Sequence, residues 1–331
     1  MPPRALEPRD TLRVRTPRGA ARRLREGRLR LAILSRNRKL YSTRRLVEAA
    51  KQRGHAVKVM DTLRCQLALA RGAPRVFYRG QEVRQLDVVI PRIGASITGY
   101  GLAVVNQFDM MGVPTLNNSV PIARSRDKLR ALQLLSRFGI DIPRTVMCRY
   151  REEVPLAVEQ VGGLPCIMKL LQGSQGVGVL LASTMTEVEG MLDTLWHLGQ
   201  DILIQQLIAE SRGKDVRALV IGDRVVAAMR RTAREGEFRS NIHRGGEGQA
   251  LELPRAYTEA AVKAVRVIGL EVAGVDMLES KEGPKIMEVN SSPGFEGLET
   301  ATGLDIAGLY VEHALEFARA QAAGWSKTRL I

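Results

Sequence analysis

Gly274-Val275-Asp276-Met277-Leu278 is an apolar stretch interrupted by one acid, and Lys285-Ile286-Met287-Glu288-Val289-Asn290 repeats that character further along the chain. The short segment between them is polar and contains Gly283-Pro284, a turn signal. Two apolar segments joined by a short polar turn predict a β-hairpin. The acids therefore lie on the strands of this hairpin rather than in a loop.

The turn decides which side chains of the hairpin face one another. In an antiparallel pair, the residue numbers of facing residues add up to the same value along the strands. A turn centred near Lys281 or Glu282 therefore puts Asp276 opposite or next to Glu288. Glu288 and Asn290 are two residues apart and point to the same face. Three oxygen-bearing side chains are thus expected to converge on one place.

These three side chains form a candidate divalent metal site. Asp276, Glu288 and Asn290 offer hard oxygen ligands with no Cys or His among them, which suits Mg²⁺ or Mn²⁺ and argues against Zn²⁺. The alternative is a solvated hairpin with ordinary surface acids. We favour the metal site because the acids interrupt strands that are otherwise apolar.

The chain as a whole has the composition of a globular α/β protein. It has 331 residues, 45% of them hydrophobic, and 31 glycines, enough for two or three lobes with sizeable cores. No apolar run approaches the roughly 20 residues of a membrane span, and the N-terminus lacks the apolar region of a secretory signal. Cys65, Cys148 and Cys166 show no metal or redox spacing. We therefore expect a cytoplasmic protein that makes no membrane contact.

Positive charge is concentrated at the N-terminus. Residues 1–30 hold ten Arg against three acids, a net charge of +7, which leaves +8 of the total +15 for the rest of the chain. The segment is rich in Pro, Gly and Arg without an apolar period, so we interpret it as a disordered basic tail. Nucleic-acid binding, if present, is expected only through this tail. A passive tail, or a start site assigned too far upstream, is the interpretation we favour. The remaining +8 favours an anionic partner.

The N-terminal third alternates strands and helices, which indicates a small parallel sheet. Its glycines form no dinucleotide-binding fingerprint. A further helix is expected next, and the pattern then changes to hairpins and helices of an α+β unit. The expected segments are strands at 31–34, 57–60 and 87–91 and helices at 42–53, 101–111 and 126–138.

A glycine-rich loop joins two predicted strands, at 166–171 and 179–182. The loop runs Gln172-Gly173-Ser174-Gln175-Gly176-Val177-Gly178, and Lys169 precedes it on the first strand. Glycines let backbone N–H groups approach phosphate oxygens, and a strand lysine can direct a compact charge at a phosphate. A Walker A motif is absent. A plain flexible turn is the alternative, but the lysine beside the loop favours a nucleotide site.

The order of these motifs resembles that of the ATP-grasp ligase superfamily, which carries a strand lysine, a glycine loop and an Asp/Glu-x-Asn metal set. The chain is similar in particular to the RimK-type ligases, which add glutamate to the C-terminus of the sixth small-subunit ribosomal protein. This resemblance extends from about Leu29 to Ala320. It rests on the motifs Ile90-Pro91-Arg92-Ile93-Gly94, Ala123-Arg124-Ser125-Arg126-Asp127-Lys128, Arg239-Ser240-Asn241-Ile242-His243-Arg244-Gly245-Gly246 and Asn290-Ser291-Ser292-Pro293-Gly294.

The resemblance implies an ATP-grasp fold preceded by a small parallel-sheet lobe, an α/β chain that becomes α+β in its C-terminal half. The expected divisions are a tail at 1–28, a pre-ATP-grasp domain at 29–117, a central lobe at 118–192 and a C-terminal lobe at 193–325. ATP would lie between the last two lobes. Two Mg²⁺ or Mn²⁺ ions would be held by Asp276, Glu288 and Asn290.

The resemblance also implies individual roles around ATP. Lys128 and Lys169 would contact the phosphates, and Asp215 would bind the ribose. Gln206 and Leu207 would hold the adenine, although the family usually has an acid at Gln206. The remaining nucleotide contacts are expected from Gly173, Ser174, Gln175, Gly176, Gly178, Arg239, Ser240 and Asn241.

The expected reaction converts a carboxylate into an acyl phosphate, which an amine then attacks. The tetrahedral intermediate needs a positive clamp, for which Arg217, Arg231 and Arg239 are the candidates. Arg92 and Arg244 are candidates for an exposed cationic entrance that attracts an acidic acceptor. We expect a homo-oligomer.

Three functions compete. The first is glutamate ligation to the acidic C-terminus of a small-subunit ribosomal protein, with L-glutamate and ATP as substrates. The second is glutamylation of a small molecule or carrier protein by an ATP-grasp ligase. The third is a non-catalytic nucleotide-binding module that reaches RNA through its tail. The complete set of metal-binding side chains argues against the third.

Overall fold

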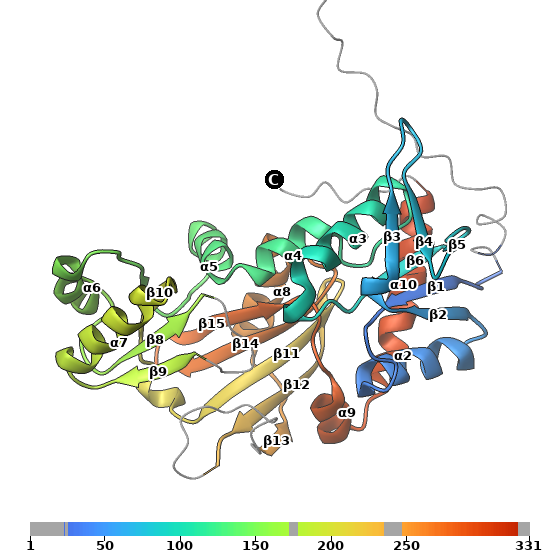
Figure 1. The fold of residues 1–331 in the computed structure, drawn as a ribbon. Helices are drawn as coiled ribbons and strands as arrows, with labels where there is room; N and C mark the ends of the chain where they lie inside the picture. The colour runs from blue at the N-terminus through green and yellow to red at the C-terminus, as the bar shows by residue number, and fades with distance from the viewer. Residues whose placement is uncertain (1–22, 24–25, 172–177, 235–246, 324–331) are drawn as a thin grey trace, which may run out of the picture.

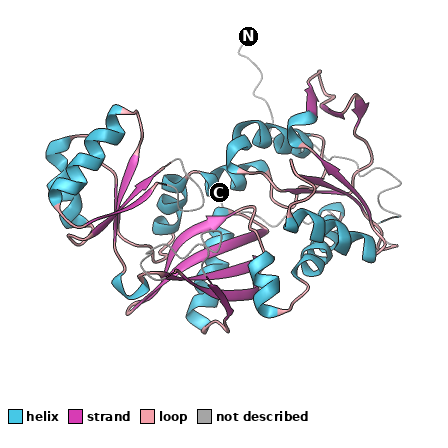
Figure 2. Ribbon diagram, turned by 60° about the horizontal axis from the view of Figure 1, so that its bottom comes forward, coloured by secondary structure: helices cyan, strands magenta, loops and turns pink. Residues whose placement is uncertain are grey.

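The structure is a computed structural model that describes residues 23, 26–171, 178–234 and 247–323 (Figure 1). The described strands form four sheets, and helices pack against them (Figure 2). In the described ranges, the connecting 3₁₀ turns are Thr62–Arg64, Ala95–Ile97, Arg151–Glu153 and Ala209–Ser211.

The N-terminal lobe is built on the predicted parallel sheet. Its strands are ordered β2-β1-β6 and are β1 (Arg30–Leu34), β2 (Ala56–Met60) and β6 (Val88–Pro91). Helices α2 (Tyr41–Gln52) and α3 (Thr98–Met110) match the two predicted helices to within a few residues. A second sheet, which the sequence analysis did not predict, contains β3 (Cys65–Ala68), β4 (Arg75–Tyr78) and β5 (Gln81–Glu82).

Two helices connect this lobe to the rest of the chain where one was predicted. They are α4 (Ser119–Arg126) and α5 (Lys128–Arg137). Asp127 separates them because its extended backbone breaks the helix, and its carboxylate caps α5 by accepting a hydrogen bond from Arg130 N. The break places Lys128 at the first position of α5.

The central lobe contains the predicted glycine-loop hairpin, β8 (Cys166–Leu170) paired with β9 (Val179–Ala182). The sheet order is β7-β10-β8-β9, with β7 (Thr145–Val146) and β10 (Ile202–Gln206). Cys166 and Met168 pack with the helices α6 (Val154–Gln160) and α7 (Met185–His197), so Lys169 points to the opposite face. Strand β10 hydrogen-bonds in this sheet, whereas the predicted boundary at 192/193 assigned it to the C-terminal lobe.

The C-terminal lobe is a five-stranded antiparallel sheet ordered β13-β12-β11-β14-β15. Helices α8 (Arg255–Ile268) and α9 (Glu296–Thr302) pack against this sheet, whereas α10 (Ile306–Ala322) packs mainly against α2 and β6 of the N-terminal lobe. The strands are β11 (Lys214–Ile221), β12 (Arg224–Thr232), β13 (Glu247–Ala250), β14 (Val272–Ser280) and β15 (Gly283–Asn290).

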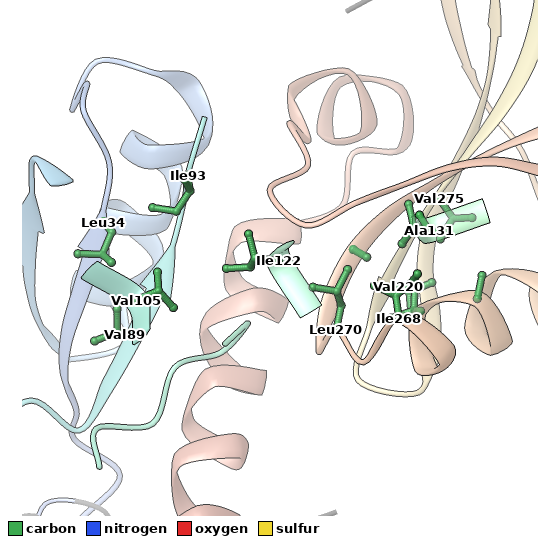
Figure 3. Close-up of a cluster of buried hydrophobic side chains, with 14 of the residues drawn as sticks. Leu34, Val89, Ile93, Val105, Ile122, Ala131, Val220, Ile268, Leu270 and Val275 are labelled. Atoms are coloured by element: carbon green, nitrogen blue, oxygen red, sulfur yellow. The ribbon is translucent and has the colours of Figure 1, made fainter. Parts of the chain in front are cut away.

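Two clusters of buried hydrophobic side chains join the N-terminal and C-terminal lobes. Figure 3 shows Val105 of the first lobe and Leu270 of the last, with Ile122 of α4 between them. All three side chains are at most 5% exposed. Helix α4 therefore packs against both lobes and fixes their relative position.

No helix in the described part of the chain has both the length and the apolar character needed to cross a membrane.

Candidate active site

The hairpin of β14 and β15 brings the predicted metal-binding side chains together. Asp276 lies directly opposite Glu288, which confirms the predicted pairing, and Gly274 lies opposite Asn290. The register shifts by one residue just after Asp276. Asn290 Nδ2 donates to Asp276 Oδ2 over 3.4 Å. The carboxylates and the amide therefore share one face of the sheet.

Strand β11 lies on the other side of β14 and provides a cation for the same carboxylate. Arg217 is opposite Asp276 in the register. Its Nε is 2.7 Å from Asp276 Oδ1 and its Nη2 is 2.6 Å from Oδ2. The Asp276 side chain is 4% exposed, so this bidentate ion pair is nearly enclosed.

A second arginine continues the row of charges onto β12. Arg231 lies opposite Asp215 and binds both of its carboxylate oxygens. Its Nη2 also lies 3.3 Å from Asp276 Oδ2. The side chains of Arg231 and Asp215 are only 3% and 1% exposed. Arg231 thus links Asp215 to Asp276.

The alternation of the strands explains why these charges gather on one face. Val216, Ala218 and Val275 alternate with the charged residues and pack with Ala264 and Val265 of α8. Successive side chains of a strand point to opposite faces, so an apolar face against α8 leaves the other face for the charges.

The two facing carboxylates have different electrostatic surroundings. Burial alone would raise the pKa of Asp276, but Arg217 and Arg231 lower it to about 2. Burial and the neighbouring Asp276 raise the pKa of Glu288. Asp276 is therefore a stable anion, whereas Glu288 lacks full compensation for its charge.

Two lysines border Glu288 from other elements. Lys128, at the start of α5, donates from Nζ to Leu170 O over 2.9 Å. Burial lowers the pKa of Lys169 to about 8, with Glu288 acting to raise it and Lys128 to lower it. Burial also lowers the pKa of Lys128, and Glu288 opposes that shift. The predicted phosphate-binding lysines thus lie close enough to each other and to Glu288 to interact electrostatically.

Arg126 belongs to the same cluster, although the sequence interpretation gave it no role. Burial lowers the pKa of Arg126, while Glu288 raises it and Arg92 lowers it. Its Nη2 donates to Ile93 O, and its Nε has no partner within the described residues. The one sequence feature that could have indicated this role is the position of Arg126 two residues before Lys128, on the other side of the helix break at Asp127.

Asp215 does not have the geometry expected of a ribose ligand. Its carboxylate is buried and both oxygens are bound to Arg231. The expected ribose role therefore has no support in this arrangement. Arg231 is also buried, so it holds Asp215 and Asp276 rather than presenting its guanidinium to a substrate.

The predicted adenine-binding segment lies at the end of β10. The backbone N–H of Gln206 donates to Arg144 O at 2.8 Å, and its side-chain Oε1 accepts from Arg144 N at 3.3 Å. Leu207 is half-buried beside it. Gln206 is therefore hydrogen-bonded to the residue that precedes β7, and the side chains of Gln206 and Leu207 are both half-buried.

Gly178 is the one predicted glycine-loop residue that the structure describes. It has a φ of +77°, and a Cβ there would lie 2.6 Å from the Leu170 side chain. A glycine is required at this position because both the conformation and the contact exclude a side chain. The other predicted nucleotide contacts lie outside the described residues, namely Gly173, Ser174, Gln175, Gly176, Arg239, Ser240 and Asn241.

Arg92 does not form an exposed entrance, so that prediction was wrong. Its Nη2 donates to Pro293 O at 2.7 Å and to Ser42 Oγ at 3.0 Å. Burial lowers its pKa. Arg92, in the Ile90–Gly94 motif, instead connects the N-terminal lobe to the turn after β15. Arg244, the other entrance candidate, lies outside the described residues.

The donor set fits a hard divalent cation. Among the described residues no three His, Cys, Asp or Glu side chains form a metal-binding group, so the candidate set consists of two carboxylates and one amide. Glu288 is a buried acid directly opposite another acid, an unfavourable arrangement that a cation between them would relieve. Mg²⁺ or Mn²⁺ accepts oxygen ligands of this kind.

Comparison with protein families gives two matches that together cover most of the chain. Residues 29–122 match the RimK PreATP-grasp domain, and residues 125–313 match the RimK-like ATP-grasp domain. The join between them falls in α4, the helix that connects the lobes.

Curated relatives match over the same region. A "probable alpha-L-glutamate ligase" of Rhodopirellula baltica is 56% identical over 285 residues, covering 86% of this chain and 70% of the relative. A protein of the same name from Ectopseudomonas mendocina is 52% identical over 285 residues, covering 86% of this chain and 95% of the relative.

Solved structures share the fold at lower identity. The ATP-grasp ligase PsnB complexed with minimal precursor has a TM-score of 0.70 at 23% identity, covering 88% of this chain and 99% of that one. A RimK domain protein ATP-grasp from Sphaerobacter thermophilus has a TM-score of 0.66 at 24% identity, covering 86% and 99%. These likenesses confirm the ATP-grasp fold that the sequence predicted.

Proposed function

Because the chain belongs to the RimK-like ATP-grasp family and is an ATP-dependent ligase, we propose that it adds L-glutamate to the C-terminus of the sixth small-subunit ribosomal protein. The observation that supports this most directly is the charged face of the C-terminal sheet. There Asp276 and Glu288 face each other, Arg217 holds Asp276, and Lys169 lies near Glu288. Curated relatives named as probable α-L-glutamate ligases support glutamate as the amino acid.

The first step of the proposed reaction activates a carboxylate. An oxygen of the acceptor's C-terminal carboxylate attacks the γ-phosphorus of ATP, the bond to the β-phosphate oxygen breaks, and ADP and an acyl phosphate form. Lys169 and Lys128 balance charge on the phosphates in this step. Asp276, Glu288 and Asn290 would hold Mg²⁺ or Mn²⁺, which would supply further neutralisation of the phosphate charge.

The second step forms the peptide bond. The amino group of glutamate attacks the acyl carbon, the tetrahedral intermediate expels phosphate, and the nitrogen loses a proton. The developing oxyanion needs a fixed cation, and Arg217 is the described candidate because it is oriented by both oxygens of Asp276. Arg239 remains a second candidate outside the described residues.

Other solved ATP-grasp ligases show that this fold accommodates a peptide and a nucleotide together. PsnB has been solved complexed with precursor peptide PsnA2 and AMPPNP. A polypeptide acceptor for this chain is therefore compatible with the fold. Glutamylation of a small molecule or carrier protein is the competing outcome.

The test is ATP turnover with L-glutamate, with and without candidate acceptors, followed by intact-mass analysis of each acceptor. The proposal expects ADP release that depends on the acceptor and a mass increase of one or more glutamyl residues on the ribosomal protein. Glu288→Gln is the control for contaminating ATPase. Turnover supported only by a small molecule or carrier protein, with no mass added to the ribosomal protein, would contradict the proposal.

A further inference from the structure

The positive charge of the folded chain belongs almost entirely to the N-terminal lobe. Residues 31–122 contain fourteen Lys and Arg against five acids, a net charge of +9, whereas residues 123–331 have a net charge of −1. The +8 that remains outside the first thirty residues is therefore not a property of the nucleotide-binding lobes. The excess positive charge of this lobe favours an anionic partner.

A cavity of about 370 Å³ lies in this lobe between the two small sheets. A loop residue after β1, the edge strand β2 and the connection of β4 and β5 line this cavity. Strands β2, β4 and β5 lie in the same region of the molecule (Figure 1). Its lining contains three cations and no acid: Arg38, Lys58, Val59, Tyr78, Arg79 and Gln81. The three cations are exposed.

The cations of this basic cavity are not neutralised by neighbouring acids. Asp61 is 3.7 Å from Arg64, and Glu82 is ion-paired with Arg84. Within the described part of the chain, no carboxylate forms an ion pair with any cation that lines the cavity. The nearby acids are thus already engaged with other arginines, and the positive potential of the cavity is left uncompensated.

Arg79 occupies a backbone position that disfavours an arginine. It and Gly80 form the two-residue connection between Tyr78 and Gln81, with φ of +52° and +78°. Such a hairpin turn favours Asn, Asp or Gly at its first position, because a bulky residue with positive φ is strained. The turn therefore places the charged side chain of Arg79 at the cavity, although its backbone conformation is unfavourable in free energy for an arginine.

Tyr78 lies beneath two of the three cations but offers no platform for a nucleic-acid base. Lys58 Nζ lies 5.2 Å from the centre of its ring, and the Arg79 guanidinium lies 5.6 Å from it. The ring is only 8% exposed. Single-stranded nucleic acids are recognised largely by stacking on open aromatic rings. The cavity instead provides positive charge and an amide, which suits carboxylates.

We propose that the basic cavity docks an acidic segment of the polypeptide acceptor, a run of Asp or Glu side chains upstream of the carboxylate that reacts. This inference rests on the proposed function for the identity of the acceptor as a polypeptide. The docking contact lies in the N-terminal lobe, so it affects acceptor affinity without taking part in the chemistry. Glutamates already added would strengthen binding, because each contributes another negative charge.

The test compares binding of a fluorescent peptide ending in several glutamates with that of a glutamine peptide of equal length. The double variant Lys58→Glu/Arg79→Glu reverses the cavity, and Arg137→Glu/Arg266→Glu is the matched control, because it reverses two exposed cations elsewhere. We expect the cavity variant to raise the Kd for the acidic peptide at least about tenfold and to leave the Kd for ATP unchanged. The control double variant should change neither constant appreciably.

Further arms keep the test decisive. Lys58→Gln/Arg79→Gln removes the charge if the reversed protein does not fold, and added salt should weaken binding of the acidic peptide far more than that of the glutamine peptide. An unchanged Kd for the acidic peptide in the folded cavity variants would overturn the proposal. Loss of affinity for an RNA hairpin but not for the acidic peptide would also overturn it, by assigning the cavity to nucleic acid.

The two proposals can fail separately. If the acidic peptide binds through the cavity but never gains mass with ATP and glutamate, the proposed function fails and the docking surface stands. If the peptide is glutamylated with the same KM by wild type and by Lys58→Glu/Arg79→Glu, the docking proposal fails and the function stands.

Discussion

Arg217 holds both carboxylate oxygens of Asp276, at 2.7 and 2.6 Å, from the strand on the opposite side of Asp276 from Glu288. The same acid therefore faces a cation on one side and another acid on the other. Arg217 fixes the orientation of the Asp276 carboxylate and keeps it ionised, which leaves Glu288 as the acid whose charge lacks a fixed partner. A site with this asymmetry is prepared for a cation beside Glu288.

We predict that Arg217→Lys lowers turnover while preserving the fold. Lysine keeps the charge but cannot make two parallel hydrogen bonds to one carboxylate. A misplacement of about 1 Å in such a site can cost about 100-fold in rate, so we expect a loss of that order in kcat. Steady-state kinetics and thermal unfolding would be measured together. A kcat near that of the wild type would show that the bidentate geometry is unimportant.

The neighbouring pair, Arg231 and Asp215, is predicted to act through stability and positioning. Both side chains are almost fully buried. Removing Asp215 leaves the buried guanidinium of Arg231 with its longer, 3.3 Å contact to Asp276, so we expect Asp215→Ala to lower the free energy of unfolding by about 3 kcal/mol.

Arg230 and Glu279 provide the matched control for that prediction. They form the same kind of bidentate pair one residue away, but their side chains are 38% and 32% exposed. Glu279→Ala should therefore cost less than about 1 kcal/mol. Denaturant unfolding of both variants decides the matter, and equal losses would mean that burial of the Asp215 pair has no energetic consequence.

Glu288→Gln is predicted to abolish turnover without unfolding the protein. The amide preserves shape but removes a charge that the proposed metal requires, so activity should fall by several orders of magnitude. The metal-free variant should be at least as stable as the wild type, because burial and Asp276 disfavour the charged form of Glu288. Addition of Mg²⁺ and a non-hydrolysable ATP analogue should raise the Tm of the wild type much more than that of the variant. Glutamate ligation close to normal would rule the site out.

The hairpin could be predicted from sequence because its information is local. The turn position fixes the register, and the register places Asp276 opposite Glu288. Lys169 was identifiable for a similar reason, since it interrupts an apolar strand beside a glycine loop. In each case the residues that matter lie within one supersecondary unit.

The rest of the site depends on contacts between distant segments, which local patterns do not encode. Arg126 comes near Glu288 only because α4 packs between two lobes. Asp215 was expected at the ribose only because of the family resemblance, whereas its pairing with Arg231 depends on how two long strands align. The small sheet β3–β5 was missed because its strands are only two to four residues long.

Lys169 is predicted to make ATP binding pH-dependent. Its pKa is lowered to about 8, so the folded protein without ligand loses this positive charge as pH rises through about 8. Phosphate binds the protonated amine, so ATP binding should take up protons above that pH. The Kd for ATP should rise by up to about tenfold per pH unit there, as expected for one coupled proton.

Calorimetry in two buffers of different ionisation enthalpy measures that proton uptake directly. Lys169→Arg is the informative variant because arginine stays charged and should flatten most of the dependence. Burial also lowers the pKa of Lys128, so a smaller dependence should persist in the variant. A wild-type Kd that is constant from neutral pH to pH 9 would show that Lys169 does not exchange a proton on binding.

The N-terminal tail is predicted to be dispensable for chemistry, but its boundary matters for stability. Arg23 lies inside the segment interpreted as tail, yet its Nε and Nη2 lie 2.9 and 2.6 Å from the two carboxylate oxygens of Asp87. The Asp87 side chain is 0% exposed and also accepts from Arg30 N at 2.8 Å. Removal of residues 1–22 should therefore leave both ligation of an acidic peptide and the Tm unchanged.

Removal of residues 1–27 should instead leave kcat unchanged and lower the free energy of unfolding by about 1–3 kcal/mol. The buried Asp87 carboxylate then loses the Arg23 cation and keeps the backbone N–H of Arg30 as a donor. In the full chain, Arg23→Gln should reproduce this loss, whereas Arg28→Gln, at an exposed position in the same segment, should not. Thermal unfolding and peptide ligation are measured on all four proteins. Loss of ligation on removing residues 1–22 would show that the tail contributes to catalysis or to acceptor binding. Equal stability of the two point variants would show that the Arg23–Asp87 pair does not stabilise the N-terminal lobe.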